Sequence, residues 1–271
     1  MFELKNARTV VVKVGTSTLT YENGKLNLRR IERLVRALSD LKNNDRRVVL
    51  VTSGAVAAGV SRLGLTSRPK ELKLKQATAA VGQGELMNIY SKMFSEYGHT
   101  VAQLLLTRDV IDDPELKANV IGTLTALLDL DTIPIINEND TVSTYELEHL
   151  ATFGENDTLA AVAAELTGAD LLILLSDIDG LYDSNPRENP DARLIPVVRG
   201  ITEDIRKVAG GAGSDRGKGG MATKIGAAEK VMSCGIPMII ASGENPEILY
   251  DIFDGRHVGT LFCPERKCQN D

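Results

Sequence analysis

Short apolar runs alternate along the chain with longer stretches in which apolar residues recur at helical spacing. Six of the apolar runs, rich in β-branched residues, predict strands over residues 9–14, 47–51, 101–106, 133–136, 171–175 and 236–241. Runs this uniformly apolar fit strands that are covered on both faces, as in a parallel sheet between helices. The pattern therefore predicts an α/β fold, a three-layer sandwich around a mainly parallel sheet.

Helical spacing is clearest between the first two predicted strands. There, six apolar residues between Leu28 and Leu41 fall on one stripe, and the charged residues lie off it. Four further helices are predicted over residues 72–97, 114–130, 157–166 and 221–234. Gly82 and Gly84 form a G-x-G pattern inside the first of these, without the preceding strand of a dinucleotide-binding motif, so we interpret them as a packing feature.

Polar and glycine residues follow the predicted strands directly, after Val14, Val51, Ile136 and Leu175. In open α/β sheets, ligands bind beyond the carboxyl ends of the strands, so these segments are expected to converge on one site. Residues 141–153 and 184–193 interrupt the regular alternation. The first of these segments lies between two polar motifs and is the better candidate for a substrate loop.

Composition narrows the class of protein. With 271 residues, one domain over residues 1–271 with two lobes is expected. A net charge of −6, no basic run and 4% aromatic residues disfavour nucleic acid as a partner. No segment approaches the roughly 20 apolar residues that span a bilayer, which disfavours a membrane protein. The three cysteines lack metal-ligand spacing, and an odd count without a secretory leader argues against a disulfide framework, so a cytoplasmic location is expected.

Lys13 and the segment Ser53-Gly54-Ala55 are the first candidates for anion binding. Lys13 precedes Gly15, which allows backbone amides to approach an anion closely, and its charge suits phosphoryl oxygens. A strand-end lysine that extends into solvent explains the same pattern. Ser53-Gly54-Ala55 suits a helix N-terminus that faces a carboxylate or phosphate, with an ordinary capped helix as the alternative. The residue order around Lys13 is not that of a Walker loop.

Two acidic motifs follow. Asn137-Glu-Asn-Asp140 comes after a predicted strand, and Asp140 has the charge to bind the ammonium group of an amino acid, although a plain turn is the alternative. Gly154-Glu-Asn-Asp157 opens a predicted helix, where Asp157 is either a simple cap or a carboxylate that orients two lysines.

The strongest local signal is residues 217–224, a glycine-rich loop that leads into a helix with Lys224 in its first turn. Phosphates bind such helix starts well, although a surface loop before a helix is the alternative. Ser176-Asp177 follows the most apolar strand and is a candidate for nucleotide binding. A calcium loop there is excluded because the required glycine and glutamate positions do not match.

Together and in this order, these motifs resemble the amino-acid kinase family. The resemblance covers nearly the whole chain, and its most specific pieces are residues 12–17, 51–55, 137–140, 154–157 and 219–224. It implies the amino-acid kinase fold, with an amino-acid-binding lobe over roughly residues 1–170 and a nucleotide-binding lobe over roughly residues 171–271. It also implies ATP-dependent phosphorylation of the side-chain carboxylate of L-glutamate, the first step of proline biosynthesis.

The resemblance assigns a role to each motif. Lys13 and Lys224 would stabilise the transferring phosphoryl group, and Asp157 would orient both lysines. The glutamate-binding residues would be Ser53, Gly54, Ala55, Asp140 and Asn156. The ATP-binding residues would be Lys13, Ser176, Asp177, Lys218, Gly219, Gly220, Met221, Ala222, Thr223 and Lys224. Because the acceptor carboxylate is already charged at neutral pH, the reaction needs alignment and charge neutralisation more than a general base.

The family also implies Mg²⁺ on the ATP phosphates, with no metal ligand assigned here to a protein residue. It implies feedback inhibition by proline, with residues 141–153 as the responsive loop, and a homo-oligomer, either dimer or tetramer. Transient contact with the glutamyl phosphate reductase of the next step is a further expectation.

Two features depart from the family pattern. Glu155 stands where Asp is expected, and the chain ends soon after Phe262, without the C-terminal PUA domain of many relatives. The rival interpretations are a kinase of the same fold that acts on N-acetylglutamate or uridylate, and a non-catalytic amino-acid sensor. Thr16-Ser17 and Ser53-Gly54-Ala55 disfavour the first, and the presence of both lysines disfavours the second.

Overall fold

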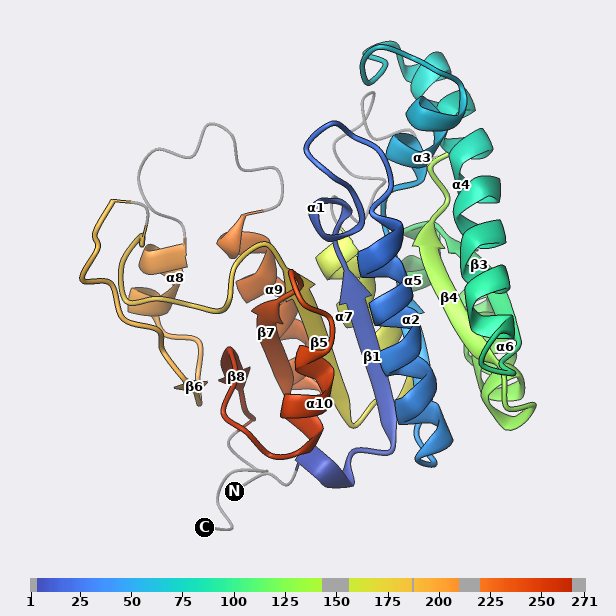
Figure 1. The fold of residues 1–271 in the computed structure, drawn as a ribbon. Coiled ribbons are helices and arrows are strands. Elements are labelled where there is room, and N and C mark those ends of the chain that lie inside the picture. The colour runs from blue at the N-terminus through green and yellow to red at the C-terminus, as the bar shows by residue number, and fades with distance from the viewer. Residues whose placement is uncertain (1–3, 143–155, 187, 210–219, 265–271) are drawn as a thin grey trace.

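The computed structural model describes residues 4–142, 156–186, 188–209 and 220–264. Its strands form one sheet in the order β3-β4-β2-β1-β5-β7-β8-β6 (Figure 1). All described strand pairs are parallel except β7 with β8, which confirms the predicted mainly parallel sheet. The strands are β1 (Thr9–Val14), β2 (Arg47–Val51), β3 (Val101–Leu106), β4 (Ile133–Glu138), β5 (Leu171–Ser176), β6 (Val197–Val198), β7 (Met238–Ser242) and β8 (Thr260–Phe262).

Helices cover both faces of the sheet, so the predicted three layers are confirmed. A short 3-10 helix, η1 (Leu4–Asn6), precedes β1. The α-helices are α1 (Thr16–Leu19), α2 (Leu28–Asn43), α3 (Ala55–Arg62), α4 (Leu72–Ser95), α5 (Asp109–Asp112), α6 (Pro114–Asp129), α7 (Asn156–Thr167), α8 (Glu203–Ala209), α9 (Met221–Ser233) and α10 (Ile248–Phe253).

The alternation of side chains along β1 divides the core in two. Val11 packs into a cluster with residues of α6, α7 and α9, whereas Val10, Val12 and Val14 pack into a second cluster with residues of α2, α4 and α10. Successive side chains of a strand point to opposite faces, so an unbroken apolar run supplies both clusters at once. The sheet is thereby held rigidly between two helical layers.

The predicted elements agree with the structure apart from their ends and the shortest strands. β7 begins at Met238 rather than at residue 236, because the Ile236 amide donates to the Val231 carbonyl at the end of α9. β4 continues to Glu138, two residues beyond its predicted end. The strands β6 and β8 are two and three residues long, too short to give a periodic signal.

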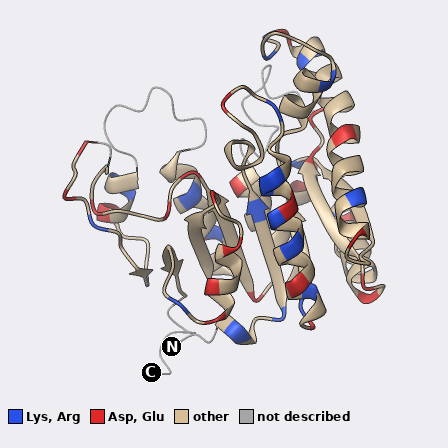
Figure 2. Cartoon of the chain, in the orientation of Figure 1, with Lys and Arg blue, Asp and Glu red and all other residues tan. Residues whose placement is uncertain are grey.

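Three features raised by the composition can be followed in the structure: the charged residues, membrane-spanning helices and the cysteines. The sheet is nearly free of charged residues, and Lys, Arg, Asp and Glu are interspersed along helices such as α2 (Figure 2). Over the residues that the structure describes, no helix is both long and apolar enough to cross a membrane. Cys234 is an exposed free thiol, but Cys263 is disulfide-bonded, contrary to the expectation from the odd cysteine count.

Gly82 is confirmed as a packing feature, but for Gly84 the interpretation was wrong, because a Cβ there would meet no atom within 4 Å. Gly82 lies inside the continuous helix α4, and a Cβ on it would stand 1.8 Å from the Ala55 carbonyl oxygen and 2.3 Å from the Gly59 amide nitrogen of α3. A Cβ on Gly59 would in turn stand 1.9 Å from the carbonyl oxygen of Thr78 in α4. Only glycine permits this approach, and the approach fixes the position of α3.

Replacing Gly82 with Ala is therefore expected to destabilise the fold by at least about 1–3 kcal/mol, because the added methyl group forces α3 away from α4. Gly84 on the same helix supplies a matched control, since a Cβ there meets no atom within 4 Å. Gly84→Ala should be neutral or stabilising by up to about 1 kcal/mol, because alanine favours helix. Denaturant unfolding compares the two variants, and equal stability would contradict the packing argument.

Candidate active site

A cavity of about 730 Å³ lies at the carboxyl ends of β1, β2 and β4, where the sequence predicted a site. These strands are consecutive in the sheet, with β2 between β1 and β4. They present Lys13, Ser53 and Asn137 to the cavity. Residues from the first turns of α3, α7 and α9 also line the cavity, so chain segments that are far apart in sequence meet at one edge of the sheet (Figure 1).

Asp157 joins the two lysines in the cavity. Its Oδ1 lies 2.6 Å from Lys13 Nζ, and its Oδ2 lies 3.1 Å from Lys224 Nζ. All three side chains are nearly buried, with residue exposures of 8%, 1% and 5% for Lys13, Asp157 and Lys224. Lys13 is therefore not a lysine extending into solvent, and Asp157 does more than cap α7.

The charge state of Asp157 follows from this pairing. Burial has the largest single effect and raises the pKa of the carboxyl, but the combined attraction of the Lys13 and Lys224 ammonium groups outweighs it and lowers the pKa below the ordinary value. Asp157 also lies in the first turn of α7, where the helix dipole favours negative charge. The carboxylate is thus ionised at neutral pH and holds two cations beside the open cavity.

A hydrogen-bonded group of amides forms the next part of the wall. The Asn156 Nδ2 atom donates to the Thr52 carbonyl and, at 3.1 Å, to Asn137 Oδ1. Asn137 Nδ2 donates to Gln83 Oε1 at 2.8 Å, and the Ser53 hydroxyl donates to the Val14 carbonyl at 2.7 Å. These bonds tie β1, β2, β4, α4 and α7 together and hold polar groups at the cavity in fixed positions.

The start of α3 supplies backbone donors. Gly54 precedes the helix with φ = +94°, a left-handed conformation that an L side chain rarely adopts. Gly54, Ala55, Val56 and Ala57 all line the cavity. The first amide groups of a helix have no partner within the helix, so this end of α3 suits an anionic group. The prediction that Ser53-Gly54-Ala55 opens a helix is confirmed.

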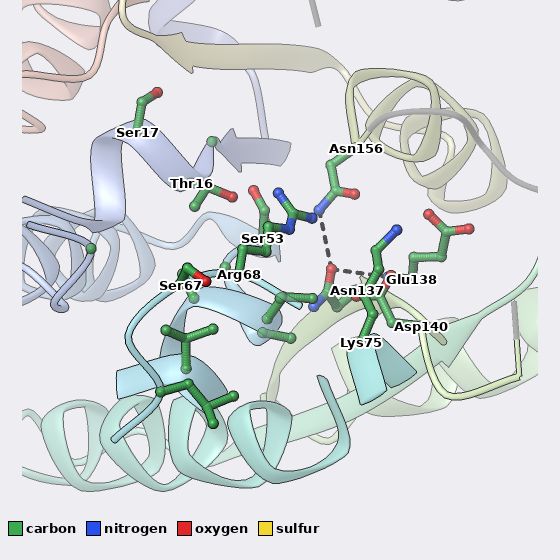
Figure 3. A pocket seen from close by; sticks show the side chains of 18 of the residues that line it. Thr16, Ser17, Ser53, Ser67, Arg68, Lys75, Asn137, Glu138, Asp140 and Asn156 are labelled. Carbon is green, nitrogen blue, oxygen red and sulfur yellow. Dashed lines mark hydrogen bonds between the residues drawn. The ribbon is translucent and has the colours of Figure 1, made fainter. Parts of the chain in front are cut away.

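Arg68 and Lys75 also line the cavity, although no motif in the sequence predicted them there. Arg68 lies between α3 and α4, and Lys75 lies in the first turn of α4 (Figure 3). Asp140 is on the same wall. Burial raises the pKa of Asp140, an effect that the positive charges of Lys75 and Arg68 partly offset.

The predicted nucleotide-binding residues that the structure describes lie at the ends of β1 and β5 and at the start of α9. Gly220, Met221, Ala222 and Thr223 lead into α9 just before Lys224. The Thr223 hydroxyl donates to the Gly220 carbonyl at 2.8 Å and contacts Asp157 Oδ2 at 3.4 Å. Lys218 and Gly219 lie outside the described residues, as do Gly154, Glu155 and nearly all of the predicted substrate loop 141–153.

Ser176 and Asp177 are not part of the described cavity wall. Ser176 is the last residue of β5 and Asp177 comes directly after it. Because β5 pairs with β1 in the sheet, both residues lie one strand away from Lys13. The Ser176 hydroxyl donates to Asp177 Oδ1 at 3.0 Å. Their role in nucleotide binding therefore stays a prediction.

A parallel sheet with two lysines, an ordering carboxylate and helix starts at its carboxyl edge defines a phosphoryl-transfer fold. The chain belongs to the amino acid kinase family, whose model matches residues 8–242. Over 97% of its length it is 54% identical to glutamate 5-kinase of Clostridium perfringens, of which it covers 98%. It is 52% identical to glutamate 5-kinase of Listeria innocua, with 97% of this chain and 96% of that protein covered. The resemblance seen in the motifs is confirmed.

Solved structures show the same fold at low identity. Isopentenyl phosphate kinase of T. acidophilum, in a product complex, superposes with a TM-score of 0.62 at 20% identity, with 94% of this chain and 99% of that chain covered. UMP kinase of Bacillus anthracis superposes with a TM-score of 0.61 at 14% identity, with 96% and 97% covered. Both matches confirm the predicted fold class.

Proposed function

We propose that this protein transfers the γ-phosphoryl group of ATP to the side-chain carboxylate of L-glutamate, which yields L-glutamyl 5-phosphate and ADP in proline biosynthesis. The observation that carries the proposal is the buried arrangement in which Asp157 pairs with both Lys13 and Lys224 at the edge of an open polar cavity. The identity of more than half to two proteins named glutamate 5-kinase supports the choice of substrate.

The residues act by placing charge rather than by moving protons. During transfer, negative charge shifts from the oxygens of the transferring group to the oxygen that leaves with ADP. One carboxylate holds both Lys13 and Lys224, so each ammonium group can stabilise part of that charge without a large rearrangement. Asp157 needs no proton of its own, and its lowered pKa keeps it in the charged form that orients the lysines.

The residues around glutamate hold the accepting carboxylate in position for the reaction. The glutamate carboxylate is a charged nucleophile already, so holding it in line with the γ-phosphorus is the main requirement. In this proposal the start of α3 at Gly54 and Ala55, the Ser53 hydroxyl and the Asn156 amide surround the substrate, and Asp140 receives its ammonium group. The hydrogen bonds from Asn156 to Asn137 and from Ser53 to Val14 preorganise this wall.

We propose that ATP lies on the β5 and α9 side of β1, over Ser176, Asp177 and residues 218–224. Among the residues that the structure describes there is no group of three His, Cys, Asp or Glu side chains suited to a metal. We propose that Mg²⁺ is held mainly by phosphate oxygens and water, as is usual for this ion. When bound, Mg²⁺ would neutralise phosphate charge alongside the two lysines.

Four wider proposals rest on the family resemblance. Proline carries an α-carboxylate and an ammonium group as glutamate does, so feedback inhibition by competition at the same pocket is proposed. We also propose a cytoplasmic homo-oligomer and one domain with an amino-acid-binding and a nucleotide-binding lobe. Transient contact with glutamyl phosphate reductase is the last of these proposals.

The deciding experiment incubates the purified protein with ATP, Mg²⁺ and one acceptor at a time: L-glutamate, N-acetylglutamate or UMP. We expect ADP release with glutamate and trapping of the acyl phosphate by hydroxylamine as the γ-hydroxamate. ADP release with UMP or N-acetylglutamate in preference to glutamate would assign a different kinase activity. Glutamate binding without ADP release would favour the sensor interpretation.

A further inference from the structure

Two cationic side chains lie in the cavity away from the Lys13 and Lys224 pair. Lys75 comes from the first turn of α4, and Arg68 comes from the segment that joins α3 to α4. Lys75 is half-buried, and Arg68 is exposed at the rim. Figure 3 shows both side chains reaching toward the part of the cavity where Asn137, Asp140 and Asn156 lie.

The cavity therefore has two ends of different construction. Lys13, Asp157 and Lys224 form one end, built from β1, α7 and α9 on the side that faces β5. Lys75, Arg68 and Asp140 form the other end, on the side of α4 and β4. If the side-chain carboxylate of glutamate lies at the first end, where phosphoryl transfer takes place, its α-carbon groups must lie toward the second.

The second end matches those α-carbon groups in charge. An amino acid carries one carboxylate and one ammonium group on its α-carbon, and this wall carries cations, Lys75 and Arg68, beside carboxylates, Asp140 and Glu138. Burial raises the pKa of Asp140, and the positive charges of Lys75 and Arg68 offset part of that rise, so the three charged groups lie in one environment. Hydrogen bonds between ionised partners are the strong class of such bonds, and they discriminate charged from neutral groups.

Resting on the proposed function, we propose that Lys75, assisted by Arg68 at the rim, binds the α-carboxylate of the substrate while Asp140 binds the α-ammonium group. Lys75 and Arg68 thereby select a free α-amino acid over an acceptor that carries only a terminal carboxylate. The contribution of Lys75 is the larger, because exposed charges such as that of Arg68 are screened by solvent.

The simplest competing explanation is that Lys75 only neutralises acidic neighbours. Glu138 and Asp140 both line the same wall, and a lysine beside two carboxylates stabilises them whether or not substrate is present. In that case removing the Lys75 charge would affect every acceptor equally. A test therefore has to compare acceptors that differ only at the α-carboxylate.

The experiment measures kcat and KM for L-glutamate and for its α-amide, L-glutamic acid 1-amide, with the wild-type protein and Lys75→Met. The amide keeps the ammonium group and the reacting carboxylate but has no charge at C1. We expect wild type to prefer glutamate by about 10–100-fold in kcat/KM, as for a charged hydrogen bond. Lys75→Met should lose most of that preference through a raised KM for glutamate, with the amide unaffected, and Lys75→Arg should keep it.

Matched controls come from the same segment. Lys73→Met removes an exposed cation of the same helical turn that does not line the cavity, and it should leave the preference unchanged. Lys70→Met is the equivalent control for Arg68→Met. The loss of preference for glutamate in Arg68→Met should be several-fold smaller than the loss in Lys75→Met. Asp140→Asn should lower kcat/KM for glutamate and its amide alike, but not for glutarate, which lacks the ammonium group.

Equal losses of kcat/KM for glutamate and the amide in Lys75→Met would overturn the inference, as would a fall in kcat with KM unchanged. Failure of the proposed function looks different, because the wild-type protein would then release no ADP with glutamate. In that event calorimetric titration of wild type and Lys75→Met with glutamate still decides: equal affinities reject the inference, and a loss of 10-fold or more supports it.

Discussion

Replacing Lys224 with Met is expected to lower kcat for glutamate-dependent ADP release by about 10²–10³-fold, the usual cost of one preorganised group that stabilises transition-state charge. Lys13→Met should have an effect of similar size, because Asp157 holds the two ammonium groups in comparable positions, 2.6 and 3.1 Å from its oxygens. KM for glutamate should change much less than kcat, since the lysines act on the phosphoryl group. Steady-state kinetics of the two variants measures both parameters.

The matched control is Lys230→Met on the same helix, α9. Lys230 pairs with Glu165 away from the cavity, and its side chain is partly exposed. Loss of such a pair costs at most about 1 kcal/mol of stability, and activity should stay near wild type. Unchanged turnover in both Lys13→Met and Lys224→Met would rule out the proposed catalytic roles.

Asp157→Asn is expected to be the most destabilising conservative change in the site. The variant keeps the shape of the side chain but removes the carboxylate charge that the two nearly buried ammonium groups share. Breaking a buried ion pair in this way costs about 3–5 kcal/mol. Thermal unfolding should show a clearly lowered Tm, and kcat should fall as the lysines separate. Lys13→Met should be milder, because Asp157 then still pairs with Lys224.

The same carboxylate gives stability a defined dependence on pH. The folded-state pKa of Asp157 lies below its ordinary value of 3.8, so folding favours the ionised form. Its contribution is complete above the unfolded-state pKa and is lost as the pH falls below 3.8 and through the folded-state value. Denaturant unfolding between pH 7 and pH 3 should show this acid limb in wild type and a shallower one in Asp157→Asn. Identical acid limbs would contradict the charge assignment.

Most of the fold could be predicted from the sequence because it depends on local periodicity. The buried strands β1, β2, β4 and β5 are continuous apolar runs, and α2 begins at Leu28 as predicted, with Asn27 capping it through the Arg30 amide. Strand β8 was not predicted, because three residues are too few to show a periodic hydrophobic pattern and because its antiparallel pairing with β7 depends on the fold around it. Helix α4 was predicted over residues 72–97 despite its two glycines, and the structure confirms it as Leu72–Ser95.

The site was predictable in part, for the same reason. Lys13 lies at the end of β1, and Ser53 and Asp140 come soon after β2 and β4. Parallel strands bring their carboxyl ends to one edge, so the convergence of these residues followed from the order of elements. Arg68 and Lys75 do not follow a strand. They reach the cavity only because α4 packs against α3 at Gly59 and Gly82, and a lysine-rich helix start has the same sequence pattern whether it faces solvent or a pocket.

By itself, the sequence determined the α/β class, the strand-end position of the polar motifs and the family resemblance, since each of these depends on the order and spacing of residues along the chain. The tertiary structure alone decided that Asp157 lies between Lys13 and Lys224, and that Lys75 shares a wall with Asp140. Such pairings join distant segments, and their distances depend on how closely helices and sheet pack, which no local pattern of residues encodes.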